Sequence, residues 1–310
     1  MSESPTRKKG LSMGAMFAIG VGIFVACAVA WSQSRAETIR FPDEANARFS
    51  VTVTGEGPDV ILIPGLGSPA AVWDGTVAKF KDQYRFHVLN LSGFAGEPAA
   101  ANGQGDVLAP SVEAVDAYIK ANDLKQPVVA GHSLGGLMAL MLAKSHPEDA
   151  SELVIVDALP FIGLIFDPNA TAQTIAPQAT AMRDSLINAP ADAFAAQQRA
   201  GAGRMVTTPA HQETVVGWSL ASDRRVFAQA MYEDLVLDLR PDLAKITTPT
   251  TVIVPVASHY GMTQDATLAF YKGAYAGQPN VTFVAVDNSL HFVMLDQPET
   301  FATALEAALK

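Results

Sequence analysis

A serine flanked by glycines is the residue of this sequence best suited to nucleophilic chemistry. Residues 131–135 read G-H-S-L-G around Ser133, between an apolar run at 127–130 and a helix-like run at 134–145. A strand that turns sharply into a helix lifts such a serine above a sheet, and only small residues fit two positions to either side. The turn also directs the Leu134 N–H, at the start of the helix, toward a developing oxyanion. The pattern therefore predicts that Ser133 attacks a carbonyl carbon.

Strand-like apolar runs alternate with helical patterns along most of the chain. The predicted strands are 48–54, 60–63, 86–91, 127–130, 153–156, 251–256 and 281–286, and the predicted helices are 70–80, 112–121, 134–145, 265–275 and 298–309. This alternation predicts an α/β fold, a mainly parallel twisted sheet with helices on both faces. From about residue 160 to 240 the pattern is helical only, which indicates a helical cap over one end of the sheet. We predict one domain, residues 37–310, that includes this cap.

Three motifs make the chain resemble the α/β-hydrolase superfamily, in particular its capped, esterase-like members. They are the G-H-S-L-G turn, P-G-L-G at residues 64–67, and L-H-F at 290–292 followed by D-Q-P at 296–298. The resemblance covers about residues 48–310. It implies the α/β-hydrolase fold and a serine hydrolase that works through an acyl-enzyme, with no cofactor and no metal. The serine sets the chain apart from family branches whose nucleophile is an aspartate.

The base must accept the serine proton as a neutral imidazole, and the chain has six histidines. The family carries its histidine after the last strand, and His291 lies there. His259, after the penultimate predicted strand, is the one rival. His132 lies in the turn itself and points away from Ser133. The others lie in a strand, at a helix end and in the predicted cap: His87, His146 and His211.

The acid that would orient His291 is where the sequence departs from the family. The family usually places it just after the penultimate strand, but residues 254–261 contain no carboxylate. Asp157 ends the strand that follows the nucleophile helix, and some family members take their acid from that strand end, so we assign the role to Asp157. Asp265, at a helix start, and Asp287, at the end of the last strand, are alternatives, and a chain without an acid also stays open.

A glycine-rich loop follows the predicted strand 60–63. The family draws an oxyanion donor from this loop, which here is the Leu66 N–H, to act beside the Leu134 N–H. Residues 65–70 also fit the G-x-G-x-x-A fingerprint of dinucleotide binding, which requires an acidic residue at the end of the next strand. Residues 90–92, which end that strand, contain none. We therefore expect no nucleotide cofactor.

The charge of the chain argues against nucleic acid as a partner. The formal net charge is −10, and residues 37–310 alone carry −13. Such a surface repels phosphate backbones, and no cluster of lysine and arginine offsets it. The one cysteine is Cys27, so residues 37–310 have no disulfide, thiolate nucleophile or cysteine-based metal site.

The first 36 residues predict export from the cytoplasm. Three basic residues at 7–9 precede an uncharged run at 10–31, and small residues surround Ala36. This is typical of a signal peptide cut near Ala36, with residues 37–310 periplasmic or extracellular. The run is also long enough for an uncleaved membrane anchor, and residues 24–27 form a weak lipoprotein motif that ends at Cys27.

The predicted cap is rich in aromatic and aliphatic side chains, and we expect residues 161–166 over the mouth of the site. Such a lining favours a small-molecule substrate with an apolar acyl or alkyl part, joined by a carboxylic ester, thioester or lactone. Two alternatives stay open. One is a C–C bond hydrolase with the same serine machinery, and the other is a non-catalytic ligand-binding protein on the same scaffold.

Overall fold

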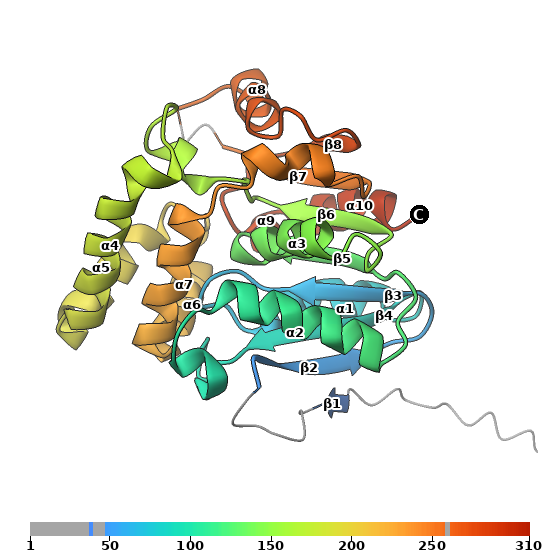
Figure 1. The fold of residues 1–310 in the computed structure, drawn as a ribbon, viewed down its shortest axis with the longest axis horizontal. Coiled ribbons are helices and arrows are strands. Elements are labelled where there is room, and N and C mark those ends of the chain that lie inside the picture. Colours follow the sequence, from blue (N-terminus) through green and yellow to red (C-terminus); the bar gives the residue numbers. More distant parts are fainter. Residues whose placement is uncertain (1–36, 40–46, 258–260) are drawn as a thin grey trace, which may run out of the picture. The chain divides into compact units, whose positions relative to one another are not determined.

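The computed structural model describes residues 37–39, 47–257 and 261–310, and within them eight strands form one sheet (Figure 1). The strands are β1 (Glu37–Ile39), β2 (Phe49–Thr54), β3 (Asp59–Ile63), β4 (Arg85–Leu91), β5 (Val128–His132), β6 (Glu152–Val156), β7 (Thr250–Val256) and β8 (Val281–Asp287). Their order is β1-β2-β4-β3-β5-β6-β7-β8. β2 pairs antiparallel with β1 and β4, and all other pairs are parallel. The predicted mainly parallel sheet is confirmed.

Helices follow most strands of the sheet. The α-helices are α1 (Asp74–Phe80), α2 (Leu108–Ala121), α3 (Leu134–Ser145), α4 (Ala172–Asn188), α5 (Ala191–Ala202), α6 (Pro209–Ala221), α7 (Arg224–Val236), α8 (Gln264–Ala274), α9 (Val293–Asp296) and α10 (Pro298–Ala308). Short 3₁₀ helices are η2 (Ala70–Trp73), η3 (Ala100–Gly103), η4 (Ile162–Ile165) and η5 (Arg240–Lys245). The helix predicted at 70–80 is thus divided into η2 and α1.

Two apolar layers hold the helices on the sheet, because successive side chains of a strand point to opposite faces. On β3, Ile61 and Ile63 belong to the layer that packs under α2, α3 and α8. Val60 and Leu62 belong to the layer on the other face, with α1 and α10. Since helices cover both faces, the central strands are continuous apolar runs. This is why these strands can be predicted from the sequence.

The segment between β6 and β7 is helical, with η4, α4, α5, α6, α7 and η5 in that order. These helices span residues 162–245 and overlap the predicted cap at about 160–240, whose role as a cap stays a prediction. Residues 1–36, predicted as a signal peptide or anchor, lie outside the described residues, so export and membrane attachment stay predictions. Among the helices of the described ranges, none has both the length and the apolar character needed to cross a membrane.

The crossing of β5 and α3 is so close that it has room only for glycine. A Cβ atom on Gly131 would lie 2.1 Å from the carbonyl oxygen of Gly135, and one on Gly135 would lie 2.3 Å from the carbonyl oxygen of Ile63. Both contacts are with backbone atoms, which cannot move aside as a flexible side chain can. These two glycines therefore set how closely the helix that follows Ser133 approaches β3 and β5.

We predict that Gly131→Ala destabilises the protein by about 1–3 kcal/mol, the usual cost of overpacking a core. The matched control is Gly217→Ala in α6, where an added Cβ meets nothing within 4 Å. Alanine favours a helix over glycine by up to about 1 kcal/mol, so the control should be neutral or stabilising. Urea unfolding followed by circular dichroism measures both. Equal midpoints for Gly131→Ala and the wild type would contradict the close crossing.

Candidate active site

Ser133 joins β5 directly to α3, as the sequence predicts. Its backbone has φ 53° and ψ −122°, a conformation that a residue with a side chain rarely adopts. Backbone hydrogen bonds hold it there: the Ser133 N–H donates to the Val156 oxygen over 2.9 Å, and the Ser133 oxygen accepts from the Gly136 N–H over 2.8 Å. Backbone strain of this kind clusters at functional sites, where the surrounding structure maintains it.

Asp157 and His291 meet at the edge of the sheet formed by the carboxyl ends of the parallel strands, where Ser133 also lies. Asp157 directly follows β6, the neighbour of β5, and has a left-handed φ of 45°. His291 lies between β8 and α9, and its Nδ1–H donates to Asp157 Oδ2 over 2.6 Å. The two side chains are 13% and 18% exposed, respectively. This bond keeps the proton on Nδ1 and leaves Nε2 as the basic nitrogen.

Tyr271 holds the second oxygen of the same carboxylate. Its hydroxyl, on α8, donates to Asp157 Oδ1, and the Asp157 backbone N–H donates to the Ile253 oxygen on β7 over 3.0 Å. The sequence analysis does not single out Tyr271. Together with Tyr275 it has the i, i+4 spacing of an ordinary buried helix face. Nothing in a single sequence distinguishes a tyrosine that anchors a carboxylate from one that fills the core.

The other candidate acids, Asp265 and Asp287, form no hydrogen bond or ion pair with His291. Asp265 is exposed in the first turn of α8, where Thr263 caps the helix by accepting from the Ala266 N–H. Asp287 is exposed at the end of β8. His259, the rival base, lies outside the described residues. Asp157 is therefore the carboxylate that the structure brings to His291.

His132 ties the nucleophile turn to the histidine loop. It is fully buried, its Nε2–H donates to the His291 carbonyl oxygen over 3.0 Å, and the two imidazole rings are 4.5 Å apart. Burial, and next the nearby His291, lower the pKa of His132 well below its ordinary value, so His132 stays neutral. Among the described residues, the Ser133 hydroxyl makes no hydrogen bond. The serine–histidine contact is often long until a substrate binds.

Asp296 anchors the loop of His291 from the other side. One carboxylate oxygen accepts from the Leu290 N–H over 2.8 Å. The other accepts from both the backbone N–H and the hydroxyl of Thr207, over 2.8 Å and 2.7 Å. The Phe292 N–H donates to the Met205 oxygen over 3.0 Å. The loop is therefore fixed to the segment between α5 and α6 on both sides of His291.

The loop after β3 lies directly against the nucleophile turn. A Cβ on Gly65 would come 3.1 Å from Ser133 Cβ. The next N–H, of Leu66, has no backbone or side-chain acceptor among the described residues. The Leu134 N–H is the first of α3, and the first N–H groups of a helix have no acceptor within it. Both groups are available for an oxyanion, although their use for one stays a prediction.

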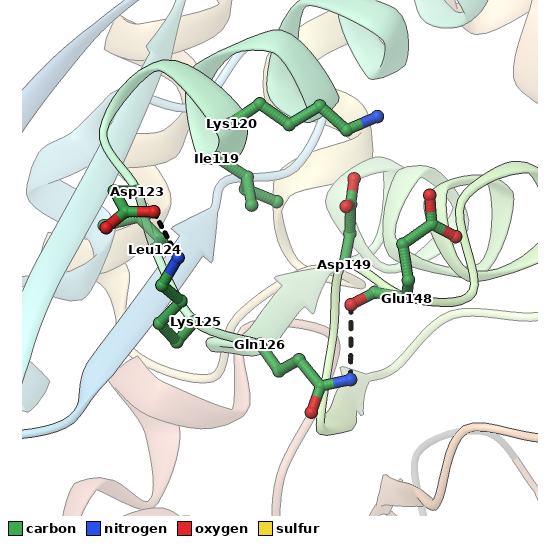
Figure 2. A pocket seen from close by; sticks show the side chains of 8 residues that line it. All are labelled: Ile119, Lys120, Asp123, Leu124, Lys125, Gln126, Glu148 and Asp149. Carbon is green, nitrogen blue, oxygen red and sulfur yellow. Dashed lines mark hydrogen bonds and ion pairs between the residues drawn. The ribbon is translucent and has the colours of Figure 1, made fainter.

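A surface pocket at the opposite edge of the sheet is separate from this site (Figure 2). It is lined by Ile119, Lys120, Asp123, Leu124, Lys125, Gln126, Glu148 and Asp149. These residues precede the amino ends of β5 and β6, whereas Ser133 and Asp157 follow their carboxyl ends. Ligands of parallel α/β sheets bind at the carboxyl ends. We therefore assign no role in catalysis to this pocket.

Three groups that could ligate a metal also lie on that edge, with their ligand atoms within 4.8 Å of one another: Glu113, Asp116 and His146. Asp116 is paired with Lys120, whose ammonium supplies the positive charge that a metal would bring. His146 Nδ1 lies 3.4 Å from the same carboxylate. This arrangement is typical of a surface ion-pair network.

Comparisons with known proteins agree with the fold. The model of the alpha/beta hydrolase family matches residues 60–304. Pimeloyl-[acyl-carrier protein] methyl ester esterases of Aeromonas hydrophila and Vibrio atlanticus are 39% and 34% identical over 112 and 116 residues, which is 36% and 37% of this chain. The matched part is only 42% of the length of each of these relatives.

Solved structures resemble the chain over most of its length. A hydrolase from Pseudomonas aeruginosa has a TM-score of 0.68 at 20% identity, over 88% of this chain and 98% of that one. The enol-lactonase from Burkholderia xenovorans has a TM-score of 0.67 at 18% identity, over 86% and 98%. At these identities the likeness shows the fold alone.

We predict that Tyr271→Phe slows the reaction of Ser133 with a fluorophosphonate roughly 10-fold, because Asp157 loses a charge-assisted hydrogen bond worth about 1.5–3 kcal/mol. Tyr275→Phe is the matched control at the C-cap of the same helix, since the Tyr275 hydroxyl donates to the Ala158 oxygen and not to Asp157. The rate constant of labelling, followed by mass spectrometry, measures both variants. Equal slowing by the two would mean that Tyr271 only supports the core.

Proposed function

The chain belongs to the alpha/beta hydrolase family, and from this premise we propose that it is a serine hydrolase of carboxylic esters, thioesters or lactones. One observation carries the proposal. His291 Nδ1 lies 2.6 Å from Asp157 Oδ2, at the edge of the sheet where Ser133 occupies a strained turn between strand and helix. A histidine oriented in this way has the means to take the proton of a serine hydroxyl.

In the first half of the proposed reaction, Ser133 Oγ attacks the carbonyl carbon and His291 Nε2 accepts the hydroxyl proton. The Leu66 and Leu134 N–H groups donate to the oxygen that becomes negative. The Asp157 carboxylate stabilises the imidazolium that forms. When the tetrahedral intermediate collapses, His291 gives the proton to the leaving alcohol or thiol, and the acyl group stays on Ser133.

In the second half, a water molecule takes the place of the leaving group. His291 Nε2 accepts a proton from this water as its oxygen attacks the acyl carbon. Collapse of the second intermediate returns the proton to Ser133 Oγ and releases the carboxylic acid. The enzyme is restored, and the overall change is hydrolysis of one ester bond.

The substrate class rests on the cap and on the relatives. Apolar side chains of α5 and α7, among them Phe194 and Phe227, pack together with Leu66 of the oxyanion loop. This supports an apolar acyl or alkyl part. The matched relatives are named methyl ester esterases, which favours an ester over a C–C bond. The absence of a carboxylate at residues 254–261 favours the non-catalytic binding protein, whereas Asp157 beside His291 supports the enzyme.

We predict that a fluorophosphonate probe labels the wild type on Ser133 and leaves Ser133→Ala unlabelled. Only a serine activated by a base and an oxyanion hole reacts rapidly with this probe. Peptide mapping by mass spectrometry identifies the modified residue. In parallel, p-nitrophenyl esters of short, medium and long acyl chains should be hydrolysed by the wild type.

The controls separate loss of chemistry from loss of fold. Ser133→Ala should match the wild type in its circular dichroism spectrum and thermal midpoint. Equal labelling of wild type and Ser133→Ala would overturn the mechanism. If none of the esters is hydrolysed while a ligand still binds at the site, the result would favour the alternative of a non-catalytic ligand-binding protein.

A further inference from the structure

Helix α7 packs directly on the edge of the sheet that carries the proposed active site. Gly67, after β3, would place a Cβ only 2.7 Å from Phe227 Cε2. Gly93, after β4, would place one 2.7 Å from Val226 Cγ2. Any side chain at these two glycines would hold the helix away from the sheet. Side chains on the inner face of α7 are therefore brought to the carboxyl ends of the strands.

Asp234 lies on that inner face, near the end of α7. Phe227, Met231 and Asp234 are at positions i, i+4 and i+7, which share one side of a helix. Phe227 and Met231 pack in one cluster with Leu66, the proposed oxyanion donor. Asp234 is also close enough to His291 for the charge of the histidine to act on it. Its position on α7 and this interaction place Asp234 near the proposed base.

This carboxyl group has no partner among the described residues, since none of them donates a hydrogen bond to it or forms an ion pair with it. The arginines on and around α7 all bind elsewhere: Arg183 to Asp184, Arg224 to the Ala189 oxygen, Arg225 to the Asn102 and Gly105 oxygens, and Arg240 to Asp238 and the Ala170 oxygen. The proposed mechanism does not use Asp234 either. Neither the contacts among the described residues nor the proposed mechanism therefore accounts for a carboxyl group at this position.

The position of Asp234 is energetically unfavourable for a carboxyl group. Burial raises the pKa of Asp234 to about 7, and the nearby His291 lowers it only in part. Residue 234 is nevertheless partly accessible to solvent. An unpartnered, desolvated carboxyl group destabilises a fold. Such groups in enzymes concentrate where a substrate supplies the missing partner.

We propose that Asp234 binds a protonated amino group of the substrate, so that the ester cleaved by Ser133 belongs to an amine-bearing compound. The inference rests on the proposed function and narrows its substrate class. An ammonium group provides both the positive charge and the N–H donors that the site lacks, in a charge-assisted hydrogen bond. The methylene groups next to it would pack on Phe227 and Met231. A cap that favours an apolar acyl or alkyl part would thus also bind one charged group of the substrate.

Three esters of nearly equal shape test the proposal: p-nitrophenyl 6-aminohexanoate, 6-hydroxyhexanoate and heptanoate, which end in an ammonium, a hydroxyl and a methyl group. The quantity measured is kcat/KM of the amino ester divided by that of heptanoate. Asp234→Asn should lower this ratio roughly 10- to 100-fold, the range for a hydrogen bond to a charged group. Since the ratio compares two substrates of one variant, it cancels any general loss of activity.

The pH dependence of the ratio distinguishes an ionic contact from a steric one. The ammonium needs the ionised carboxylate, and the pKa of Asp234 is about 7. In the wild type the ratio should therefore rise with pH through about 7, whereas in Asp234→Asn it should be flat. The matched control is Asp184→Asn, which removes a carboxylate from an exposed position on α4. Its ratio should equal that of the wild type at every pH.

Two results would overturn the proposal while leaving the hydrolase intact. One is an unchanged ratio in Asp234→Asn, and the other is a loss confined to the hydroxy ester, which would identify a neutral donor. If no ester is hydrolysed, the proposed function fails, and calorimetric titration with n-hexylamine as its ammonium ion decides the inference. Binding weakened at least 10-fold by Asp234→Asn would support it. Equal affinity, or no binding to the wild type, would overturn it.

Discussion

The hydrogen bond between Asp157 Oδ2 and His291 Nδ1 is the interaction on which the proposed site depends. It joins residues 134 positions apart, and it forms because β6, β7 and β8 are parallel neighbours whose carboxyl ends share one edge. Each partner is held by further bonds. Tyr271 and the backbone of β7 fix the carboxylate, and His132 and Asp296 fix the histidine loop. The tautomer of His291 is therefore set before any substrate binds.

The family usually carries its acid in the turn after the penultimate strand, whereas here the carboxylate bonded to His291 follows the neighbouring strand, β6. The segment after β7 still contributes, because α8 brings Tyr271 to the displaced carboxylate. The groups around the His291 imidazole also differ in charge. His132, below it, is kept neutral by burial, so that it donates to the His291 carbonyl without repelling a charged His291 ring. On α7, Asp234 has no hydrogen-bond or ion-pair partner among the described residues, and the proposed amine-bearing substrate would supply one.

Features that depend on neighbouring residues can be predicted from the sequence, whereas features that depend on contacts between distant residues cannot. The turn at Ser133 is local, since glycines two residues away and an apolar strand before it are enough to specify it, and the buried parallel strands are equally legible. The choice among Asp157, Asp265 and Asp287 depends on which strand ends meet in space, which periodicity does not record. Nothing in the sequence distinguishes Asp234, because its burial and its lack of a partner depend on residues that are distant in the chain. The helix predicted at 70–80 begins as the 3₁₀ helix η2, whose Trp73 is buried in the core.

The most direct test of the account compares how fast a fluorophosphonate labels Ser133 in Asp157→Asn, Asp265→Asn and Asp287→Asn, because labelling requires no knowledge of the substrate. If Asp157 orients His291, its amide variant favours the wrong tautomer. Its labelling rate constant should fall by up to ~10⁴-fold, as in a serine-protease triad, with the thermal midpoint little changed. The variants at 265 and 287 should label like the wild type. A mild effect of Asp157→Asn, or a collapse at either of the other positions, would contradict the assignment.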